Sequence, residues 1–312
     1  MELHFLGTSS GSPSRSRNVA ATAVSFERSK AWLLVDCGEG TQHQIMKSQL
    51  SPYHLAAICI THLHGDHCYG LPGLLAAMMV SGRKEPVDFI APKAVIAFVH
   101  STLSLTELVL PFDLRTHALE ELQLSLRLEF CQLDVIALRH RVPSVAFKIT
   151  ETLIPRKLHL ELLKAHGITS GPHYNQLQRG FDVDYQDARL RSAEYSYFSW
   201  QPRCVIICGD NEKPELLANH LAGVDVLVHE ATFTHADLHK VGYHTGHSDA
   251  KRIAEFAHKY QLPHLVLFHF SVRYHAEGML EPLKREAQRS FQGQLTLAED
   301  GLILPIAKQL TK

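Results

Sequence analysis

The stretch AICITHLHGDH, residues 57–67, places four metal-ligating side chains within six positions, directly after an apolar run. These side chains belong to His62, His64, Asp66 and His67. A single histidine at the end of a strand is usually structural, but four such side chains this close together favour a metal site. Imidazole nitrogens combined with a carboxylate oxygen suit zinc, and manganese or cobalt accept the same ligands.

Short apolar runs that end in a polar residue recur along the chain. Each run is four to seven residues long, which suits a strand buried on both faces better than a helix. The polar residues that end these runs are Asp36, His62, His140, Asp210, His229 and His269. Helical patterns lie between several of the runs, so the sequence predicts an α/β fold. Sites in such folds gather at the carboxyl ends of strands, and we therefore expect these side chains to converge.

Two of the helical patterns can be placed on the sequence. Residues 40–50, GTQHQIMKSQL, follow the run that ends at Asp36. Residues 247–262 precede the last apolar run, and we expect Ser248 to be the N-cap of that helix.

The cluster at residues 62–67 does not by itself complete the coordination of a metal ion, so the remaining ligands must come from other strand ends. A carboxylate can bridge two cations with one oxygen to each, and Asp210 is placed to do so. One ion then takes His62, His64, His140 and Asp210, and the other takes Asp66, His67, Asp210 and His269. Two ions about 3.5–4 Å apart activate water and neutralise charge on a phosphoryl oxygen. The predicted chemistry is hydrolysis rather than electron transfer.

The composition is that of an ordinary globular chain: of 312 residues, 45% are hydrophobic and 20% charged. There is no apolar stretch long enough to span a bilayer and no secretory signal pattern at the start, so we expect a soluble, cytoplasmic protein. The net charge of −1 gives no overall attraction to nucleic acid, so any such binding must use local patches. The six cysteines lie mostly in apolar runs without a CxxC pair, which predicts reduced, buried thiols.

Residues 153–198 break the pattern of strands and helices. They contain one short amphipathic helical pattern, followed by Gly, Pro, Asn and Gln without clear periodicity, and we interpret them as an insertion or arm. Four basic residues face a single acid, Glu161, over positions 156–179. On charge alone, a solvated surface loop remains the alternative to a functional arm.

The motif THLHGDH, residues 61–67, resembles the signature of the metallo-β-lactamase superfamily. Within it, SPSRSRN at residues 12–18 is similar to the Pro-x-Lys-x-Arg-Asn loop of the tRNase Z family, with Arg15 where lysine is usual. The chain looks like the bacterial ElaC type of that family, also called ribonuclease BN.

Three further stretches carry the same resemblance. HEAT at residues 229–232 matches a motif of the tRNase Z family as it stands, and HTGHS at 244–248 supplies the histidine that follows it. SGPHYNQLQRG at residues 170–180 resembles the Gly-Pro stretch of the family's tRNA-binding arm. The matches together run from residue 7 to residue 270, nearly the whole chain.

The resemblance implies a four-layer αββα sandwich that forms a single domain over residues 1–312. Residues 153–198 would be an inserted, flexible tRNA-binding arm. The implied activity is that of an endonuclease with two Zn²⁺ per subunit, or Mn²⁺ or Co²⁺ in their place. It would remove the 3′ trailer of precursor tRNA, leaving a 3′-hydroxyl on the tRNA and a 5′-phosphate on the trailer. Exonuclease activity stays open.

The resemblance also implies roles for individual residues. Asp66 would accept a proton from the attacking water, His247 would contact the scissile phosphate or protonate the departing oxygen, and Glu230 would fix the tautomer of His247. Residues expected to contact RNA are Arg15, Arg17, Asn18, Lys164, Gly171, Pro172 and Arg179.

A homodimer is implied as well, with the arm of one subunit serving the active site of the other. The apolar stretch LPGLLAAMMV, residues 71–80, is either an interface helix or an ordinary core helix. No membrane and no other protein partner is expected.

Two other functions were weighed. A small-molecule hydrolase of the same superfamily, such as a glyoxalase II or a lactonase, shares the metal cluster, but the HEAT motif, the 12–18 loop and the arm argue against it. A metal-stabilised RNA-binding scaffold with a decayed site is disfavoured because all seven ligand positions are filled.

Overall fold

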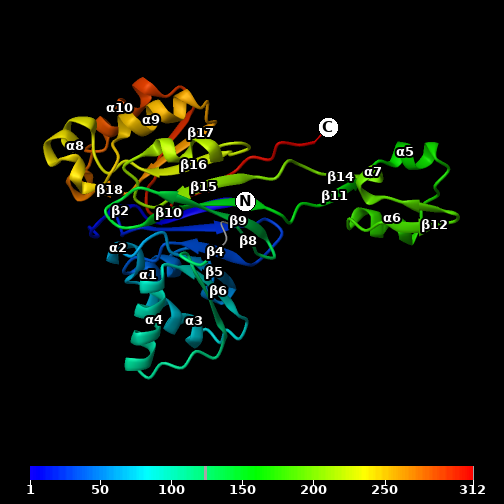
Figure 1. Cartoon of the computed structure of the whole chain (residues 1–312), viewed down its shortest axis with the longest axis horizontal. Helices are drawn as coiled ribbons and strands as arrows, with labels where there is room; N and C mark the ends of the chain where they lie inside the picture. The colour runs from blue at the N-terminus through cyan, green and yellow to red at the C-terminus, as the bar shows by residue number, and fades with distance from the viewer. Residues whose placement is uncertain (123–124, 312) are drawn as a thin grey trace.

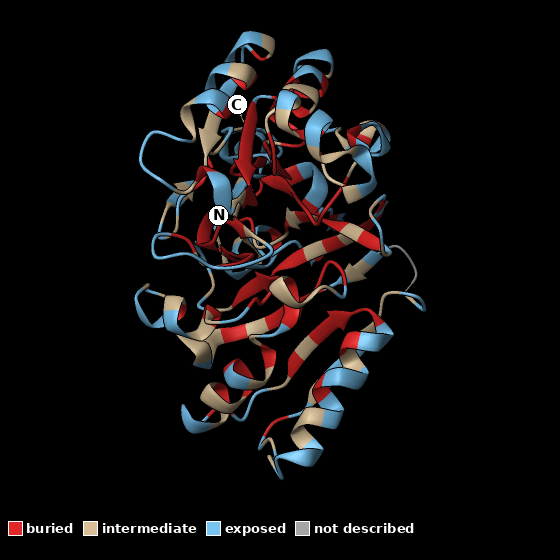
Figure 2. Cartoon of the chain, turned by 90° about the vertical axis from the view of Figure 1, so that its left-hand side faces the viewer, coloured by how far each residue is buried: buried red, intermediate tan, exposed pale blue. Residues whose placement is uncertain are grey.

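The computed structural model describes residues 1–122 and 125–311. Two seven-stranded sheets pack face to face, and helices cover the outer face of each (Figures 1 and 2). The first sheet has the order β20-β1-β3-β4-β5-β6-β7. Its strands are β1 (Glu2–Gly7), β3 (Ala21–Ser25), β4 (Trp32–Val35), β5 (Leu55–Cys59), β6 (Val87–Ala91), β7 (Leu114–Ala118) and β20 (Ile303–Pro305).

The second sheet has the order β19-β17-β16-β15-β10-β9-β8. Its strands are β8 (Ser125–Arg127), β9 (Cys131–Leu138), β10 (Ser144–Glu151), β15 (Cys204–Cys208), β16 (Val226–Glu230), β17 (His264–Phe268) and β19 (Gln294–Leu297). Strands β15, β16, β17 and β19 run parallel to one another, while β8, β9, β10 and β15 are joined by antiparallel pairings. A short parallel pair joins β2 (Ser9–Ser10) to β18 (Phe270–Ser271).

Helices form the two outer layers. The first sheet is covered by α1 (Thr41–Met46), α3 (Leu71–Val80) and α4 (Lys93–Leu105). The second is covered by α8 (His235–Val241), α9 (Ala250–Lys259) and α10 (Glu281–Ser290). Shorter helical turns are α2 (Gly65–Cys68), η1 (Pro52–His54), η2 (Pro214–His220), η3 (Tyr243–Thr245) and η4 (Val272–Tyr274).

Alternation along the central strands explains the layers. In β15, Val205 and Ile207 pack between the two sheets, while Ile206 packs against the helices of the second sheet. Successive side chains of a strand point to opposite faces, so a strand covered on both sides must be apolar throughout. The prediction of strands buried on both faces is therefore confirmed, and so is the four-layer αββα sandwich.

The arm leaves the sandwich after β10 and returns before β15, and it projects to one side (Figure 1). Strands β11 (Arg156–Leu158) and β14 (Ser196–Phe198) pair antiparallel as its stalk. Its outer part comprises α5 (Leu160–Ala165), α6 (Pro172–Gln178), β12 (Val183–Tyr185), β13 (Ala188–Leu190) and α7 (Ser192–Tyr195). A small separate core holds these pieces together: Leu163, Ile168, Leu177, Val183, Leu190 and Tyr195.

The expectation of one short helix in the arm was wrong, because three form. The pattern over 172–178 has no amphipathic repeat, but Pro172 occupies the first turn, where its missing N–H costs nothing. The buried Leu177 fixes this helix to the arm's own core.

Two helix boundaries also differ from the prediction. The N-cap of α9 is Asp249, whose carboxylate accepts from Arg252 N at 2.9 Å, whereas the Ser248 hydroxyl donates to the carbonyl of Asn211. Helix α1 ends at Met46 rather than at residue 50. There, the Ser48 hydroxyl and backbone N–H both donate to the Ile45 carbonyl, which closes the last turn.

The apolar stretch at residues 71–80 forms α3, and its inner face belongs to the core. Leu71, Leu74, Leu75 and Met78 are buried against the first sheet. All six cysteines are free and buried, which confirms that prediction. Among the described residues, no helix combines the length and the apolar character needed to cross a membrane.

Candidate dimetal active site

The predicted ligands meet where loops from the two sheets come together. The loop after β5 carries the cluster at residues 62–67, and its Thr61 carbonyl accepts from Val145 N of the second sheet at 3.1 Å. Ligand atoms of His62, His64, His140 and Asp210 all lie within 4.8 Å of one another, as do those of Asp66, His67 and His269. The structure thus brings together all seven side chains that the sequence singled out, in two adjacent groups.

Asp210 lies between the two groups. Its Oδ2 is 3.7 Å from His62 Nε2 and 3.6 Å from His140 Nε2. Its Oδ1 is 3.5 Å from His67 Nε2 and 3.3 Å from His269 Nε2. The carboxylate is buried, and Oδ1 has no hydrogen-bond partner among the described residues. A buried oxygen normally requires a partner, and a cation held by both groups supplies one.

The spacing of the imidazole nitrogens fits a shared ion. His64 Nδ1 lies 3.1 Å from His62 Nε2 and 3.2 Å from His140 Nε2. In the other group, His67 Nε2 lies 3.2 Å from His269 Nε2. Zinc bonds of 2.0–2.1 Å in a tetrahedron separate neighbouring ligand atoms by about 3.3–3.4 Å. The donor set therefore fits two such ions in both chemistry and distance.

Second contacts orient these rings, as is usual for metal-binding histidines. In each case the nitrogen turned away from the site meets a hydroxyl, a carboxylate or a backbone carbonyl. The contacts are His62 Nδ1 with Thr61 Oγ1 (3.0 Å), His67 Nδ1 with Asp36 Oδ2 (2.7 Å), His140 Nδ1 with Gly246 O (2.8 Å) and His269 Nδ1 with Thr232 Oγ1 (3.1 Å).

Asp36 is a functional residue that the sequence interpretation left outside the site. Besides meeting His67, its carboxylate accepts from both the backbone N–H and the hydroxyl of Thr61. Its φ is 61°, and that of His269 is 57°, a left-handed conformation that is costly for residues other than glycine. The available signal was its position at the end of the run AWLLVD.

The buried carboxylates favour positive charge at this place. Burial alone lowers the pKa of His67, yet Asp36, Asp210 and Asp66 together raise it to about 10. For Asp66 burial acts to raise the pKa, but the imidazoles of His67 and His269 outweigh it and hold that pKa well below its ordinary value. Asp66 is therefore ionised at neutral pH.

His247 and Glu230 form a pair beside the first ligand group. His247 Nδ1 lies 3.1 Å from Glu230 Oε2, and Glu230 is fully buried. Burial lowers the pKa of His247, but the carboxylates of Glu230 and Asp210 outweigh this effect and raise it to about 9. Since Glu230 occupies Nδ1, Nε2 is the nitrogen left for a substrate.

Asn211, which sequence reasoning missed, holds this pair in place. Its backbone N–H donates to Glu230 Oε1 at 2.7 Å, and its side-chain amide contacts His229 Nε2 at 3.0 Å. The Thr232 hydroxyl donates to the other oxygen of Glu230. His229 thus supports the site from behind, and the position of Asn211 directly after Asp210 was the signal available.

The three residues predicted to contact RNA from the 12–18 loop differ in exposure. Arg15 is exposed, and Asn18 is partly buried with its amide donating to the Glu39 carbonyl. Arg17 is buried under the loop, where its guanidinium donates to Thr8 Oγ1 and Ala298 O and lies over the Phe270 ring. Its side chain holds the loop from below.

The predicted contacts in the arm lie far along the chain from the metal ligands, in and around its helices. Lys164 is exposed in α5, 3.2 Å from Glu161. Gly171 and Pro172 form the start of α6, and Arg179 caps its end, exposed. Within the described residues, the arm contributes no side chain to the two groups of ligand atoms.

Comparison with known proteins places the chain in a family. A family model described as Anti-Pycsar protein Apyc1 matches residues 1–153, just under half of the chain. Ribonuclease Z of Pseudomonas putida is 47% identical over 304 residues, covering 96% of this chain and 95% of that protein.

Solved structures agree with that relative. Human tRNase Z, short form, is 28% identical with a TM-score of 0.68, covering 98% of this chain and 100% of that one. The metallo-β-lactamase fold protein YhfI from Bacillus subtilis has a TM-score of 0.67 at 16% identity over 97% of both chains, which shows the fold alone. The resemblance drawn from the motifs is confirmed: the chain belongs to the ribonuclease Z (tRNase Z) family of the metallo-β-lactamase superfamily, and is a metal-dependent endoribonuclease.

Proposed function

We propose that this enzyme cuts precursor tRNA at the junction between the mature 3′ end and the trailer. The products are a 3′-hydroxyl on the tRNA and a 5′-phosphate on the trailer. The observation that carries the proposal is the convergence of seven metal-ligating side chains beside the His247–Glu230 pair, in a chain from the ribonuclease Z family. Because that substrate is made in the cytoplasm, the cytoplasmic location remains part of the proposal.

Two Zn²⁺ per subunit are the ions proposed for the site. His62, His64 and His140 would hold one, Asp66, His67 and His269 the other, and Asp210 would bridge them. When bound, two such ions lower the pKa of water and neutralise charge that develops on phosphoryl oxygens. Mn²⁺ and Co²⁺ accept the same nitrogen and oxygen ligands and are the alternatives.

Asp66 would accept the proton of the attacking water. Its low pKa keeps it ionised, and its Oδ2 also accepts from Gly11 N at 2.7 Å. That hydrogen bond links the carboxylate to the loop that precedes residues 12–18, so the proton acceptor is positioned from two sides. A carboxylate that ligates an ion can also orient the water beside it.

His247 would donate a proton to the departing 3′ oxygen. With a pKa raised to about 9 it is protonated at neutral pH, and Glu230 holds the ring by Nδ1. The proton at Nε2 is then available to the oxygen as the P–O3′ bond breaks. This produces the 3′-hydroxyl of the tRNA directly.

The arm is proposed as a flexible second grip on the tRNA body. Residues 156–198 carry six basic and five acidic residues, so the whole lobe is nearly neutral. The excess of positive charge lies in the first half, where the four basic residues face one acid. Contacts to phosphates position a nucleic acid without reading its sequence, which suits an enzyme that must accept many tRNAs.

In the 12–18 loop, Arg15 and Asn18 are proposed to hold the acceptor end. Arg17 would act through the shape of the loop, because its guanidinium is committed to Thr8 and Ala298.

A homodimer with exchanged arms is also proposed. The outer surface of α3 and α4 exposes large apolar side chains, among them Val80 (80% exposed), Leu105 (86%) and Val109 (81%) just beyond α4. Sedimentation of the protein as a 35 kDa monomer at micromolar concentration would remove this part of the proposal.

The experiment that tests the function is cleavage of a precursor tRNA with a 3′ trailer, with both product ends mapped to the nucleotide. The proposal expects one cut beside the discriminator base, leaving a 3′-hydroxyl, and no cut by the Asp210→Ala variant. Hydrolysis of a small phosphodiester without cleavage of the precursor would keep the dimetal site and reject the substrate.

A further inference from the structure

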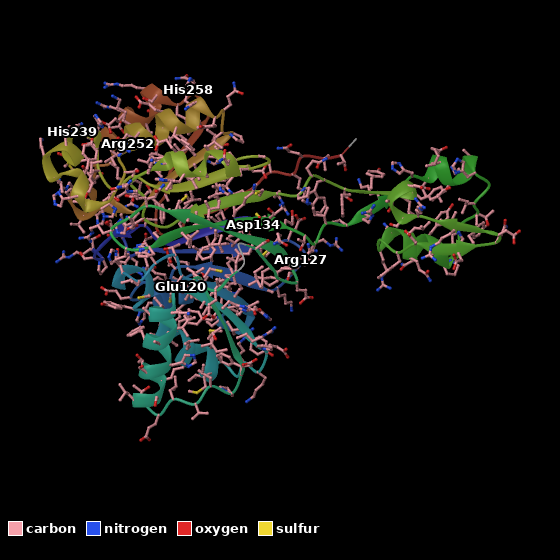
Figure 3. The ribbon with its side chains drawn as sticks, in the orientation of Figure 1. Glu120, Arg127, Asp134, His239, Arg252 and His258 are labelled. Atoms are coloured by element: carbon pink, nitrogen blue, oxygen red, sulfur yellow. The ribbon has the colours of Figure 1, made fainter. Side chains whose placement is uncertain are left out.

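A second place on the molecule brings histidine nitrogens together, outside the dimetal site. His235 and His239 lie one turn apart on α8, so their side chains share one face of the helix. Their Nε2 atoms are 3.2 Å apart, the same separation as between His67 and His269 in the dimetal site. His239 is exposed at the outer end of α8, on the side of the molecule away from the arm (Figure 3).

The orientation of His235 is fixed by a carboxylate. Its Nδ1 lies 3.0 Å from Asp249 Oδ2, and Asp249 is fully buried. The Nδ1 proton is therefore donated to Asp249, which leaves the lone pair of Nε2 directed toward His239. A carboxylate behind a histidine in this way is the usual arrangement for a metal ligand, because it fixes the tautomer and raises ligand basicity.

The second nitrogen also receives a hydrogen bond. The Tyr243 hydroxyl lies 3.1 Å from His239 Nε2 and can donate to it. In that arrangement two lone pairs face each other at 3.2 Å, which repels unless a proton or a cation lies between them. Because His239 is exposed, an ion from solution can reach this position and displace the tyrosine contact.

The charges around the pair favour a cation. Asp249 lies behind His235, and Glu286 accepts from the backbone N–H of His235 at 2.9 Å. Positive groups lie nearby as well: Arg252 is over the ring of Tyr243, and Lys240 is 3.5 Å from Asp237. Lys240 is thus matched by its own acid, and both carboxylates closest to His235 remain to stabilise an ion.

We infer that His235 and His239 form a further site for a divalent transition-metal ion, separate from the two groups of the active site. The ion takes the two Nε2 atoms, Asp249 orients the first ring from behind, and water fills the remaining positions. Zinc and copper are the ions that prefer imidazole in such a site. With two protein ligands and open positions, the site binds reversibly and more weakly than the dimetal site.

Zinc itself is the probe that tests this inference. Full-length wild type is dialysed against micromolar free zinc, and bound metal per chain is measured by elemental analysis. His239→Gln is expected to bind one ion fewer than the wild type. The difference between the two proteins carries the test, so the result does not depend on how many ions the active site holds.

Two further variants separate the site from chance binding to a histidine-rich surface. Asp249→Asn keeps an N-cap for α9 but removes the charge behind His235, and it should weaken the extra ion by about tenfold. His258→Gln, an exposed histidine at the end of α9 that Figure 3 also labels, is the matched control and should retain the wild-type number. The inference is overturned if His239→Gln binds as many ions as the wild type, or if His258→Gln loses one as well.

Discussion

The carboxylate of Asp36 lies 2.7 Å from Nδ1 of His67, and both residues are buried at the ends of segments from the same sheet. This contact turns the other nitrogen of His67 toward His269 and Asp210. Asp36 itself pays a conformational cost for its place, with a φ of 61°. We conclude that it positions a ligand without contacting the ion itself.

Replacing Asp36 by Asn should weaken metal binding by about 10–100-fold, the usual cost of losing a carboxylate behind a ligating histidine. The amide cannot hold His67 with the same charge, so the ring loses basicity. Competition with a chelator, followed by bound metal per chain, measures the loss. Asp88→Asn removes a similar Asp–His contact, 2.9 Å from His117 and away from the site, and should leave affinity unchanged.

Replacing His247 by Asn should lower kcat on precursor tRNA by about 10²–10⁴-fold, the range for a lost general acid. Binding of the substrate should change little, because the metal ligands and the arm remain. Equal losses in kcat and in substrate affinity would instead assign His247 to binding.

The pH profile tests the same pair. A general acid works while protonated, so activity should fall as the pH rises through the pKa of His247, which is about 9 in the protein. Glu230→Gln removes the carboxylate that raises this pKa, and the alkaline limb should move toward lower pH. A limb at the same pH in both proteins would show that another group controls it.

A buried ion pair joins the two ends of the arm to the core. Glu151 ends β10 and Arg203 precedes β15; Arg203 Nη2 lies 2.6 Å from Glu151 Oε1, and both side chains are almost fully buried. Burial raises the pKa of Glu151, but hydrogen bonds from Arg203 and Trp200 outweigh it, so its pKa lies below the ordinary 4.5.

Glu151→Gln should therefore lower the free energy of unfolding by about 3–5 kcal/mol at neutral pH, since it leaves the buried Arg203 charge unpaired. Because the folded-state pKa is depressed, this stabilisation is complete above the ordinary pKa and is lost as the pH falls through the folded value. Denaturant unfolding at several pH values should show the gap between variant and wild type closing in acid. Glu161→Gln, in the exposed pair with Lys164, should show no gap at any pH.

Deleting the arm tests its role directly. Arg156 and Phe198 are paired neighbours in the stalk, so a short Gly-Ser link can replace residues 156–198. The truncated enzyme should lose at least about tenfold in kcat/KM on precursor tRNA, equivalent to roughly 1.4 kcal/mol of lost contact. Hydrolysis of a small phosphodiester should stay near the wild-type rate. Equal loss of both activities would make the arm part of the fold instead.

The sequence predicted those parts of the site that depend on short stretches. His62, His64, Asp66 and His67 share one loop, and His140, Asp210 and His269 follow apolar strands, so strand-end position alone identified them. Asp36 and Asn211 were missed because their roles come from contacts across the fold, to His67 and to Glu230.

The same reasoning explains the other differences. Arg17 belongs to a motif with exposed neighbours, and only the packing of Thr8, Ala298 and Phe270 around it places its guanidinium underneath the loop. The internal structure of the arm was also missed, because its helices are too short to show periodicity and depend on a small core contributed by distant positions.

The most direct test of the central claim, that Asp210 bridges two ions, is anomalous diffraction at the zinc absorption edge from crystals grown with zinc. The account predicts two peaks about 3.5–4 Å apart, one beside His62, His64 and His140 and the other beside Asp66, His67 and His269, with Asp210 between them. A single peak in this cluster, or two peaks with Asp210 turned away from one of them, would contradict it.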